Sequence, residues 1–360
     1  MLNPLVEIFI VRDWPNKFYI NVNNSHYNMT FKVGIAGFGS IGVLHAQIFD
    51  TLQEVQTIQV ADPNKSQEGR FQFLSKKGAF FDDYRKLEAC NCVVIALPTE
   101  LHAEAVSYFS SRKIPMLIEK PIGLTYEESK RIIETVKREQ VPAMCGLTGL
   151  YHPEFRAMYE QLRTIGDLVS IHEKLHEANS NLARVLGEER GVLTMNGIHT
   201  LHRFYKIASL KDDTKTLEVG NITLDHRYFM MPGEDYAEGI LYLGQIPFTF
   251  SMSFRNGRKC DNDLPIEYIL EIKGTKGIII VIGYEKCETH YHTGKTVVNY
   301  QHPNGPLRME SQYSRIGLGL RAEIQEFIRF LGTKKKKHHT LEEALAGQKL
   351  VEECYAIAKK

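Results

Sequence analysis

The sequence has 360 residues, a length that suggests two domains, because a single hydrophobic core rarely keeps growing beyond roughly 250–300 residues. Its hydrophobic content of 43% and charged content of 24% are ordinary for a globular protein. The formal net charge of +1 gives no long-range field toward nucleic acid or an anionic membrane, and no apolar run approaches the roughly 20 residues of a membrane span. These properties predict a cytoplasmic protein with neither a nucleic-acid nor a membrane partner.

The first 28 residues are unlike the rest of the chain. Residues 1–28 combine a short apolar cluster with Asp13, Pro15 and several Asn, and they lack the residue order of a signal peptide. Two interpretations stay open: Met29 is the natural start and the segment is a translated leader, or the segment is an arm that packs on the body or on a partner. We expect a peripheral extension that contributes nothing to chemistry.

Strands and helices alternate through the first half of the chain. Strands are predicted at 31–36, 55–61, 92–97, 115–119 and 142–147, helices at 40–52, 66–74, 102–111 and 126–139, and a short amphipathic piece at 82–87. Thr125 is the expected N-cap of the helix at 126–139, because Glu128 follows at the capping-box spacing. The alternation predicts right-handed βαβ units and a doubly wound parallel sheet.

The pattern changes after about residue 165. Predicted strands rich in β-branched and aromatic residues follow at 167–177, 218–231, 236–244, 247–255, 266–273 and 277–283, with helices near 191–207, 317–331 and 340–358. Short strands separated by glycine-containing turns predict a mostly antiparallel sheet in an α+β domain. The predicted organisation is an extension at 1–28, an α/β domain at 29–150 and an α+β domain at 151–360. The six cysteines form no C-x-x-C pair and are expected to be reduced thiols.

A glycine motif separates the first predicted strand from the first helix. Residues 37–42 read Gly-Phe-Gly-Ser-Ile-Gly, the pattern G-x-G-x-x-G. Gly37 permits the tight turn, Gly39 lets the backbone approach a pyrophosphate, and Gly42 lets helix and strand pack closely. The N–H groups at the start of the helix then face the anion. The motif in this context predicts a dinucleotide-binding site.

An acid at the end of the second strand supports this prediction. Asp62 lies 20 positions after Gly42, where an acid binds the hydroxyls of the adenosine ribose. Its charge would repel a 2′-phosphate and therefore favours NAD over NADP, whereas the nearby Lys65 keeps NADP open.

Two polar clusters follow the next strands. One contains Leu97, Pro98, Thr99 and His102, and the other is Glu119-Lys120-Pro121. Ligands of open α/β sheets bind at the carboxyl ends of the strands, so both clusters are expected beside the cofactor. A lysine there can bond a substrate hydroxyl and act as a general base. By position alone, the more frequent alternative is a solvent-exposed charge at a strand end.

Several segments occur in the order known from one protein family. They are Gly37–Gly42, "VADPN" at 60–64, "ALPTELHAEAV" at 96–106, Glu-Lys-Pro at 119–121, "GIHTLH" at 197–202 and "EIKGTKG" at 271–277. The chain resembles the glucose-fructose oxidoreductase, inositol dehydrogenase and rhizopine catabolism (Gfo/Idh/MocA) oxidoreductases from about residue 30 to the last helix. The resemblance implies a Rossmann domain followed by an open-faced sheet domain, a bound NAD(P), a sugar, cyclitol or related substrate, and homodimers or homotetramers formed through the sheet.

The resemblance also implies roles for individual residues. Lys120 is the expected catalytic lysine, His199 the substrate-side histidine that relays a proton, and Glu119 a contact of the nicotinamide ribose. The expected cofactor-binding residues are Gly37, Phe38, Gly39, Ser40 and Ile41 along the pyrophosphate, Asp62 on the adenosine ribose, and Leu97, Pro98, Thr99, His102, Glu119 and Lys120 around the pocket.

Three positions depart from the family pattern. Met195 stands where the family often has an Asp four residues before the histidine, and His202 stands where an Asp usually follows it. The loop that often reads Arg-Phe-His-Pro begins here with Leu150. We therefore expect substrate contacts from a different set of residues, namely Tyr151, His152 and Asn196.

The segment 171–177 places two histidines and two glutamates at alternate positions. In a strand, His172 and His176 share one face and Glu173 and Glu177 the other. We interpret them as polar sheet residues facing the substrate cleft or a subunit partner, and we predict no metal site.

The predicted function is that of an NAD(P)-dependent dehydrogenase or reductase acting on CH–OH groups. Lys120 removes the hydroxyl proton and His199 orients the substrate or relays the proton. The alternative is a non-catalytic dinucleotide-binding regulatory protein, which Met195, His202 and Leu150 motivate. A third option is transfer or isomerisation with the cofactor cycling in place.

Overall fold

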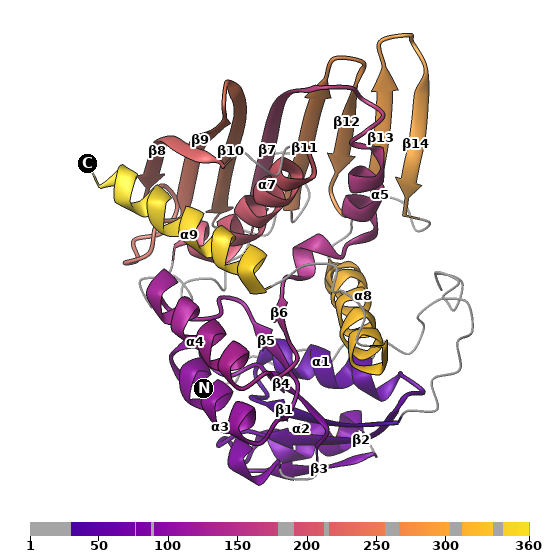
Figure 1. The fold of residues 1–360 in the computed structure, drawn as a ribbon, viewed down its shortest axis with the longest axis vertical. Coiled ribbons are helices and arrows are strands. Elements are labelled where there is room, and N and C mark those ends of the chain that lie inside the picture. Colours follow the sequence, from indigo (N-terminus) through magenta and orange to yellow (C-terminus); the bar gives the residue numbers. More distant parts are fainter. Residues whose placement is uncertain are drawn as a thin grey trace.

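The computed structural model describes residues 30–75, 77–87, 90–178, 191–211, 216–255, 266–302, 312–333 and 341–359. These residues form a six-stranded parallel sheet and an eight-stranded, mostly antiparallel sheet, each covered by helices (Figure 1). The predicted fold class is therefore confirmed. The predicted extension at 1–28 and Cys260 lie outside the described residues.

The six-stranded sheet has the order β3-β2-β1-β4-β5-β6, and all its pairings are parallel. Every residue of β4, β5 and β6 is buried, which explains why these strands are continuous apolar runs. The elements are β1 (Phe31–Ala36), α1 (Ser40–Asp50), β2 (Val55–Ala61), α2 (Gln67–Leu74), β3 (Gly78–Phe81), β4 (Cys92–Ile95), α3 (His102–Ser111), β5 (Met116–Glu119), α4 (Tyr126–Arg138) and β6 (Ala143–Gly146).

Strand β3 was not predicted from the sequence. It is a four-residue edge strand, Gly-Ala-Phe-Phe, whose first two residues are small and exposed, so its apolar run is too short to indicate a strand. Its pairing with β2 depends on Gly78, because a Cβ there would lie 1.5 Å from the carbonyl oxygen of Ile58. The predicted cap of α4 is present: the Thr125 hydroxyl accepts the Glu128 N–H at 3.1 Å.

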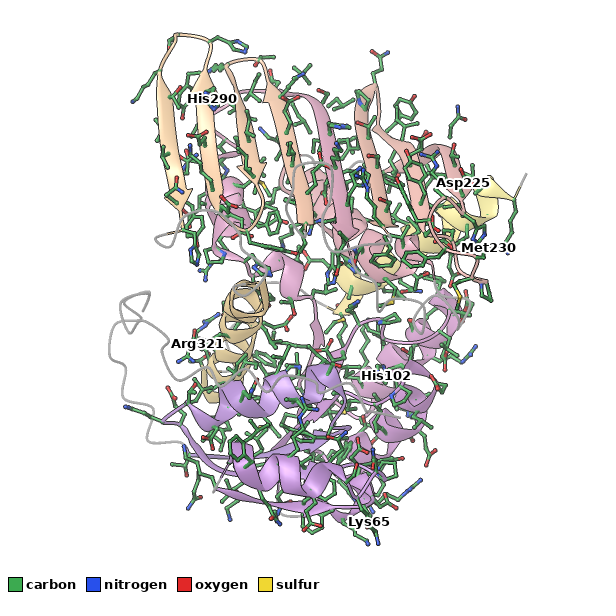
Figure 2. All side chains as sticks on the ribbon, turned by 180° about the vertical axis from the view of Figure 1, so that it is seen from behind. Lys65, His102, Asp225, Met230, His290 and Arg321 are labelled. Atoms are coloured by element: carbon green, nitrogen blue, oxygen red, sulfur yellow. The ribbon has the colours of Figure 1, made fainter. Side chains whose placement is uncertain are left out.

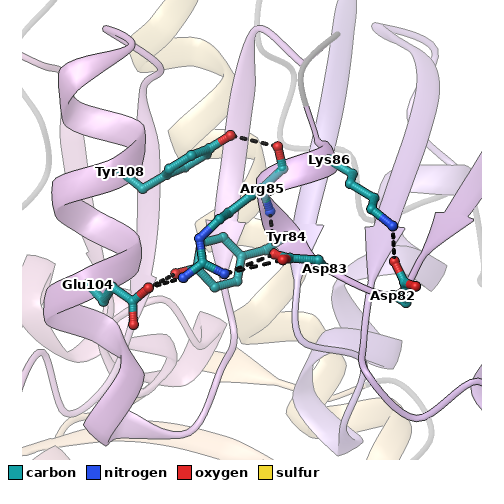
Figure 3. A network of polar contacts seen from close by, with 7 residues as sticks. All are labelled: Asp82, Asp83, Tyr84, Arg85, Lys86, Glu104 and Tyr108. Atoms are coloured by element: carbon teal, nitrogen blue, oxygen red, sulfur yellow. Dashed lines mark hydrogen bonds and ion pairs between the residues drawn. The ribbon is translucent and has the colours of Figure 1, made fainter.

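The connection between β3 and β4 is fastened to α3 by polar contacts at the surface (Figure 3). It contains the short 3₁₀ helix η1 (Tyr84–Lys86), whose N-cap Asp83 accepts the Arg85 N–H at 2.8 Å. The Arg85 guanidinium pairs with Glu104 of α3, and the Tyr108 hydroxyl donates to the Arg85 carbonyl at 2.6 Å. This is the amphipathic piece that the sequence predicts. Because both charged side chains are about half exposed, the ion pair contributes little stability.

The eight-stranded sheet has the order β14-β13-β12-β11-β7-β10-β9-β8, and only the central pair β7–β10 is parallel among its described pairings. Strands β13 and β14 were not predicted, because both are partly exposed and mix polar with apolar residues, and β14 is an edge strand. The strands are β7 (Leu168–Ala178), β8 (Glu218–Asp225), β9 (Tyr236–Leu243), β10 (Ile246–Arg255), β11 (Ile266–Gly274), β12 (Gly277–Ile282), β13 (Lys286–Tyr291) and β14 (Thr296–Gln301).

The strand predicted at 218–231 was too long and ends at Asp225. The buried carboxylate of Asp235 accepts the backbone N–H groups of residues 227–229, which turns the chain away from the sheet. Figure 2 shows Asp225 and Met230 at this edge.

One face of the eight-stranded sheet carries the helices α5 (Pro153–Gln161), α7 (Ile198–Lys211) and α9 (Leu341–Ala358) (Figure 1). Helix α5 was not predicted. The π-helical turn η4 (Leu193–Gly197) leads directly into α7. Seen from behind, the other face carries no helix of the described part of the chain (Figure 2).

The last two helices connect the sheets. Helix α8 (Gln312–Thr333) returns to the six-stranded sheet and buries Leu320, Ile324 and Phe327 in its core. Helix α9 contributes to both cores, with Leu341 in the first and Leu350 in the second. The two halves are therefore packed together along the line where the strands of the first sheet end.

Two further findings concern the chemistry of the chain. No described helix combines the length and apolarity needed to cross a bilayer. The five cysteines that the structure describes are buried free thiols, namely Cys90, Cys92, Cys145, Cys287 and Cys354.

Candidate active site

A cavity of about 440 Å³ lies between the two sheets. Its lower wall comes from the first sheet, and its upper wall comes from the second sheet and α7. It brings together nine predicted site residues: Ile41, Leu97, Pro98, Thr99, Glu119, Lys120, His152, Asn196 and His199. The cofactor-side and substrate-side clusters of the sequence analysis therefore meet at one place.

The glycine turn has the geometry that a pyrophosphate requires. Gly37 has φ +95°, and a Cβ there would lie 2.4 Å from the Ala96 carbonyl oxygen, so only glycine fits. A Cβ at Gly42 would lie 2.1 Å from the Gly37 carbonyl oxygen, which shows how closely α1 approaches β1. A Cβ at Gly39 would meet nothing within 4 Å, and Ser40 is exposed, so the space at the start of α1 is open. These residues fit a bound dinucleotide.

Asp62 is held in place at the end of β2. Its Oδ2 accepts the Phe38 N–H at 2.8 Å and its Oδ1 accepts the Asn64 N–H at 2.8 Å. This geometry fixes the carboxylate beside the glycine turn, where a ribose would lie. Lys65 is exposed at the far end of the first sheet (Figure 2).

Lys120 lies in the cavity at the end of β5. Its Nζ donates a hydrogen bond to the backbone carbonyl of Met195 at 3.1 Å. Met195 stands where the family often has an Asp, so the backbone at this position holds the lysine although the side chain offers no carboxylate. The neighbouring Asn196 amide lies 3.4 Å from the Glu177 carboxylate.

Glu119 is buried directly beside Lys120. Its Oε1 lies 2.7 Å from Nε2 of His45 on α1, and its Oε2 accepts the Lys120 N–H at 3.3 Å. A Cβ at Gly146 would lie 3.1 Å from the carboxyl atoms, so the small residue on β6 makes room for this side chain. The carboxylate is fixed at the floor of the cavity.

Arg203 and Glu173 form a buried ion pair on the substrate side. Arg203 is 3% exposed and lines the cavity, and its Nε donates to Glu173 at 3.2 Å. Thr200 also donates to the Glu173 carboxylate at 2.7 Å. The guanidinium lies over the rings of Phe155 and Tyr268, at 4.6 and 5.6 Å from their centroids. The negative charge of Glu173 and the positive charge of Arg203 therefore compensate each other inside the protein.

The two histidines of the cavity are neutral at neutral pH. Burial and the charge of Arg203 lower the pKa of His152 to about 3. Burial, Lys120 and Arg203 lower the pKa of His199 well below its usual value. A neutral imidazole can accept a hydrogen bond at one ring nitrogen and donate one at the other, which suits a residue that orients a polar substrate.

Three predicted site residues lie elsewhere. His102 is buried and does not line the cavity. Its ring nitrogens lie 3.1 Å from the Ile122 carbonyl and 3.0 Å from the Leu97 carbonyl, so it holds the backbone of the cavity wall in place. Tyr151 is buried in the core of the first sheet. The Phe38 side chain packs against the Phe71 ring, so only its backbone lies at the glycine turn. These residues support the site without facing the cavity.

Sequence reasoning missed several residues of the upper wall. Tyr268 and Tyr284 line the cavity with Glu177, and their rings stack at 6.3 Å. Arg203 was missed although it follows the noted His202 directly. The only sequence signal was the alternation of Glu173 and Glu177 on one strand face, which the structure confirms as the face toward α7 and the cavity.

Comparison with known proteins agrees with the dinucleotide-binding site that the glycine turn predicts. Residues 31–147 match the family model described as "Oxidoreductase family, NAD-binding Rossmann fold". The chain is 27% identical over 139 residues to the rhizopine catabolism protein MocA of Rhizobium meliloti, covering 37% of this chain and 42% of that protein. It is 26% identical over 136 residues to the inositol 2-dehydrogenase of the same species (strain 1021), covering 36% and 40%. These two alignments each span less than half of the relative's length.

The structural likeness extends over both sheets. An oxidoreductase from Agrobacterium radiobacter, solved in complex with NAD⁺, L-tartaric acid and magnesium, superposes with a TM-score of 0.77. The alignment covers 92% of this chain and 97% of that one at 19% sequence identity. At this identity the likeness shows the shared fold.

Proposed function

The chain belongs to the Gfo/Idh/MocA oxidoreductases through residues 31–147, and we propose from this premise that it transfers a hydride between a nicotinamide cofactor and a CH–OH group of a sugar, cyclitol or related small polar compound. The observation that carries the proposal is the position of Lys120 in one cavity with the glycine-turn side on one wall and polar side chains on the other. The proposed cofactor is NAD.

Lys120, His199, His152 and Asn196 have different roles in the proposed reaction. When bound, the nicotinamide supplies the acceptor or donor of the hydride. The Nζ of Lys120, held by the Met195 carbonyl, accepts the proton of the substrate hydroxyl. His199, which is neutral, bonds a hydroxyl and holds or relays the proton, and His152 and Asn196 contact other polar groups. The fixed geometry of these groups supplies much of the acceleration.

The test is a screen of purified protein against sugars, inositols and sugar acids with NAD and NADP, followed by absorbance of the reduced cofactor. We expect at least one compound to reduce NAD. Cofactor binding without turnover of any compound, together with a stable protein partner recovered by pull-down, would favour the alternative of a non-catalytic regulatory protein. Product formed without net reduced cofactor would point to internal redox cycling.

The choice between NAD and NADP gives a separate prediction. In Asp62→Ser, the KM for NAD is expected to rise by about 10–100-fold, because charge-assisted hydrogen bonds to the ribose are lost. The preference for NAD over NADP is expected to fall further, because the carboxylate no longer repels a 2′-phosphate. Steady-state kinetics with both cofactors measure this, and the exposed Asp167→Ser is the matched control. An unchanged cofactor preference would contradict the ribose role of Asp62.

We also propose that two copies of the chain associate through the uncovered face of the eight-stranded sheet. Ile269 and Ile282 are directly paired on β11 and β12 and are 38% and 41% exposed, and Val298 on β14 is 52% exposed. Paired exposed isoleucines on an open sheet favour burial against another surface.

Light scattering of the purified protein tests this association. We expect a dimer or tetramer for the unmodified chain and a smaller species for Ile282→Lys, because a charge would be buried in the interface. Phe73→Lys, at an apolar position on α2 that is 57% exposed, is expected to leave the mass unchanged. A monomeric unmodified chain would refute the proposal.

A further inference from the structure

A second carboxyl group is buried beside Glu119. Glu323 comes from α8 and has no exposed surface. Its Oε2 accepts the Thr148 hydroxyl at 3.2 Å, and its Oε1 is buried with no hydrogen-bond partner among the described residues. After burial itself, the charge of Glu119 is the largest influence that raises the pKa of Glu323. A carboxylate with one oxygen left unbonded in this position would be strongly unfavourable.

The groups around this pair share one small region of the core. His45 on α1 contacts Glu119, and its Nδ1 is buried without a partner, so the geometry assigns the ring proton to Nε2 as the donor to Glu119. Cys145 on β6 lies close enough that Glu323, Glu119 and Lys120 all influence the pKa of its thiol, which burial raises first. Lys120 adjoins Glu119 in the chain, and its charge also reaches Cys145.

Tyr151 is joined to Thr148, because its backbone N–H donates to the Thr148 carbonyl at 3.0 Å. Burial, Glu323 and Glu326 raise the pKa of the Tyr151 phenol, so this group is neutral. Burial and the charge of Glu119 raise the pKa of Glu323 well above its usual value, while the Leu147 backbone and Thr148 lower it. The hydrogen bonds oppose the effect of burial and of the Glu119 charge, and burial prevails, so the pKa of Glu323 is raised overall.

We propose that Glu323 is a positioning residue that keeps a proton beside Glu119, so that the buried carboxyl pair carries a single negative charge next to Lys120. This charge state serves the base proposed above, and to that extent the inference rests on the proposed function. A second buried negative charge would stabilise the ammonium form of Lys120 and leave fewer molecules with the free amine that accepts a substrate proton. It would also repel Glu119 from its place on His45.

The first readout needs no substrate. Infrared difference spectra between the unmodified protein and Glu323→Gln are expected to show the carbonyl band of a protonated carboxylic acid at neutral pH. The matched control is Glu326→Gln on the same helix, whose carboxylate is paired with Arg329 and is expected to show no such band. A spectrum without the protonated band overturns the inference.

The second readout is the pH dependence of stability. Folded Glu323 binds its proton to higher pH than the unfolded chain does, so its contribution to stability is complete at low pH and is lost as pH rises. As pH rises above the ordinary glutamate pKa of 4.5, the urea concentration at the unfolding midpoint is expected to fall less in Glu323→Gln than in the unmodified protein. In Glu119→Gln the protonated band should disappear at lower pH, because the neighbouring charge is gone. If the unfolding midpoint changes equally with pH in the unmodified protein and in Glu323→Gln, the inference is overturned.

The third readout concerns turnover. For Glu323→Gln, kcat/KM at neutral pH is expected to stay within about twofold of the unmodified value, because the amide copies the shape and charge of a protonated carboxyl. A tenfold loss with an unchanged stability slope indicates a charged Glu323 and contradicts the proposal. If the protonated band is present but no compound is turned over, the inference about Glu323 stands and the proposed function is refuted. If a compound is turned over but the band is absent, the proposed function stands and the inference about Glu323 is refuted.

Discussion

Replacing Lys120 by methionine is expected to lower kcat/KM by about 10²–10⁴-fold, the usual contribution of a positioned general base. Methionine keeps most of the length and apolar volume of the side chain but removes the amine that the Met195 carbonyl holds in the cavity. The binding of the dinucleotide is expected to persist, because the glycine turn and Asp62 remain intact. Turnover assays and a titration of reduced-cofactor fluorescence measure the two effects separately.

The matched control is Lys113→Met, which removes an exposed lysine that pairs with Glu139 at the surface. It is expected to leave both turnover and cofactor binding unchanged. If Lys120→Met turned over substrate at the rate of the control, the proton would have to leave through another group, and His199 also lines the cavity.

The second large effect is expected at the buried ion pair of the upper wall. Arg203→Met should lower the free energy of unfolding by about 3–5 kcal/mol, because Glu173 is then left buried without its cation. Urea denaturation measures the change. The double variant Arg203→Met with Glu173→Leu is expected to recover part of the loss, because no uncompensated charge remains.

The control for this prediction is Arg85→Met, which removes an arginine from an exposed pair with Glu104 (Figure 3). Its effect on stability is expected to be much smaller, because solvent screens that pair. Equal losses in Arg203→Met and Arg85→Met would show that burial does not set the strength of the Arg203 pair.

The cofactor half of the site could be read from the sequence because its signals are local. Gly37, Gly39 and Asp62 belong to one βαβ unit, and Lys120 follows a strand of the same parallel sheet. Strands of such a sheet are buried on both faces, so they are visible as apolar runs. Strand β3 escaped prediction because it is a short edge strand that carries little of this signal.

The substrate half could not be read in the same way, because its residues come together only through tertiary packing. Phe155, Arg203 and Tyr268 lie on two helices and a strand that are far apart in the chain. His102 and Tyr151 show the opposite error: each stands in a segment that borders the cavity, but the side chain turns into the core. The direction of a side chain at a strand end depends on packing that sequence spacing does not encode.

The return of α8 to the first sheet has a consequence for how the protein is made. Residues 31–147 leave the ribosome long before Leu320, Ile324 and Phe327, which complete their hydrophobic core. Until α8 is synthesised, the nascent nucleotide-binding half exposes the apolar surface that this helix covers, and Glu119 has no Glu323 beside it. The cavity floor is therefore one of the last parts of the molecule to be assembled, and a fragment that stops before α8 is expected to aggregate rather than bind the cofactor.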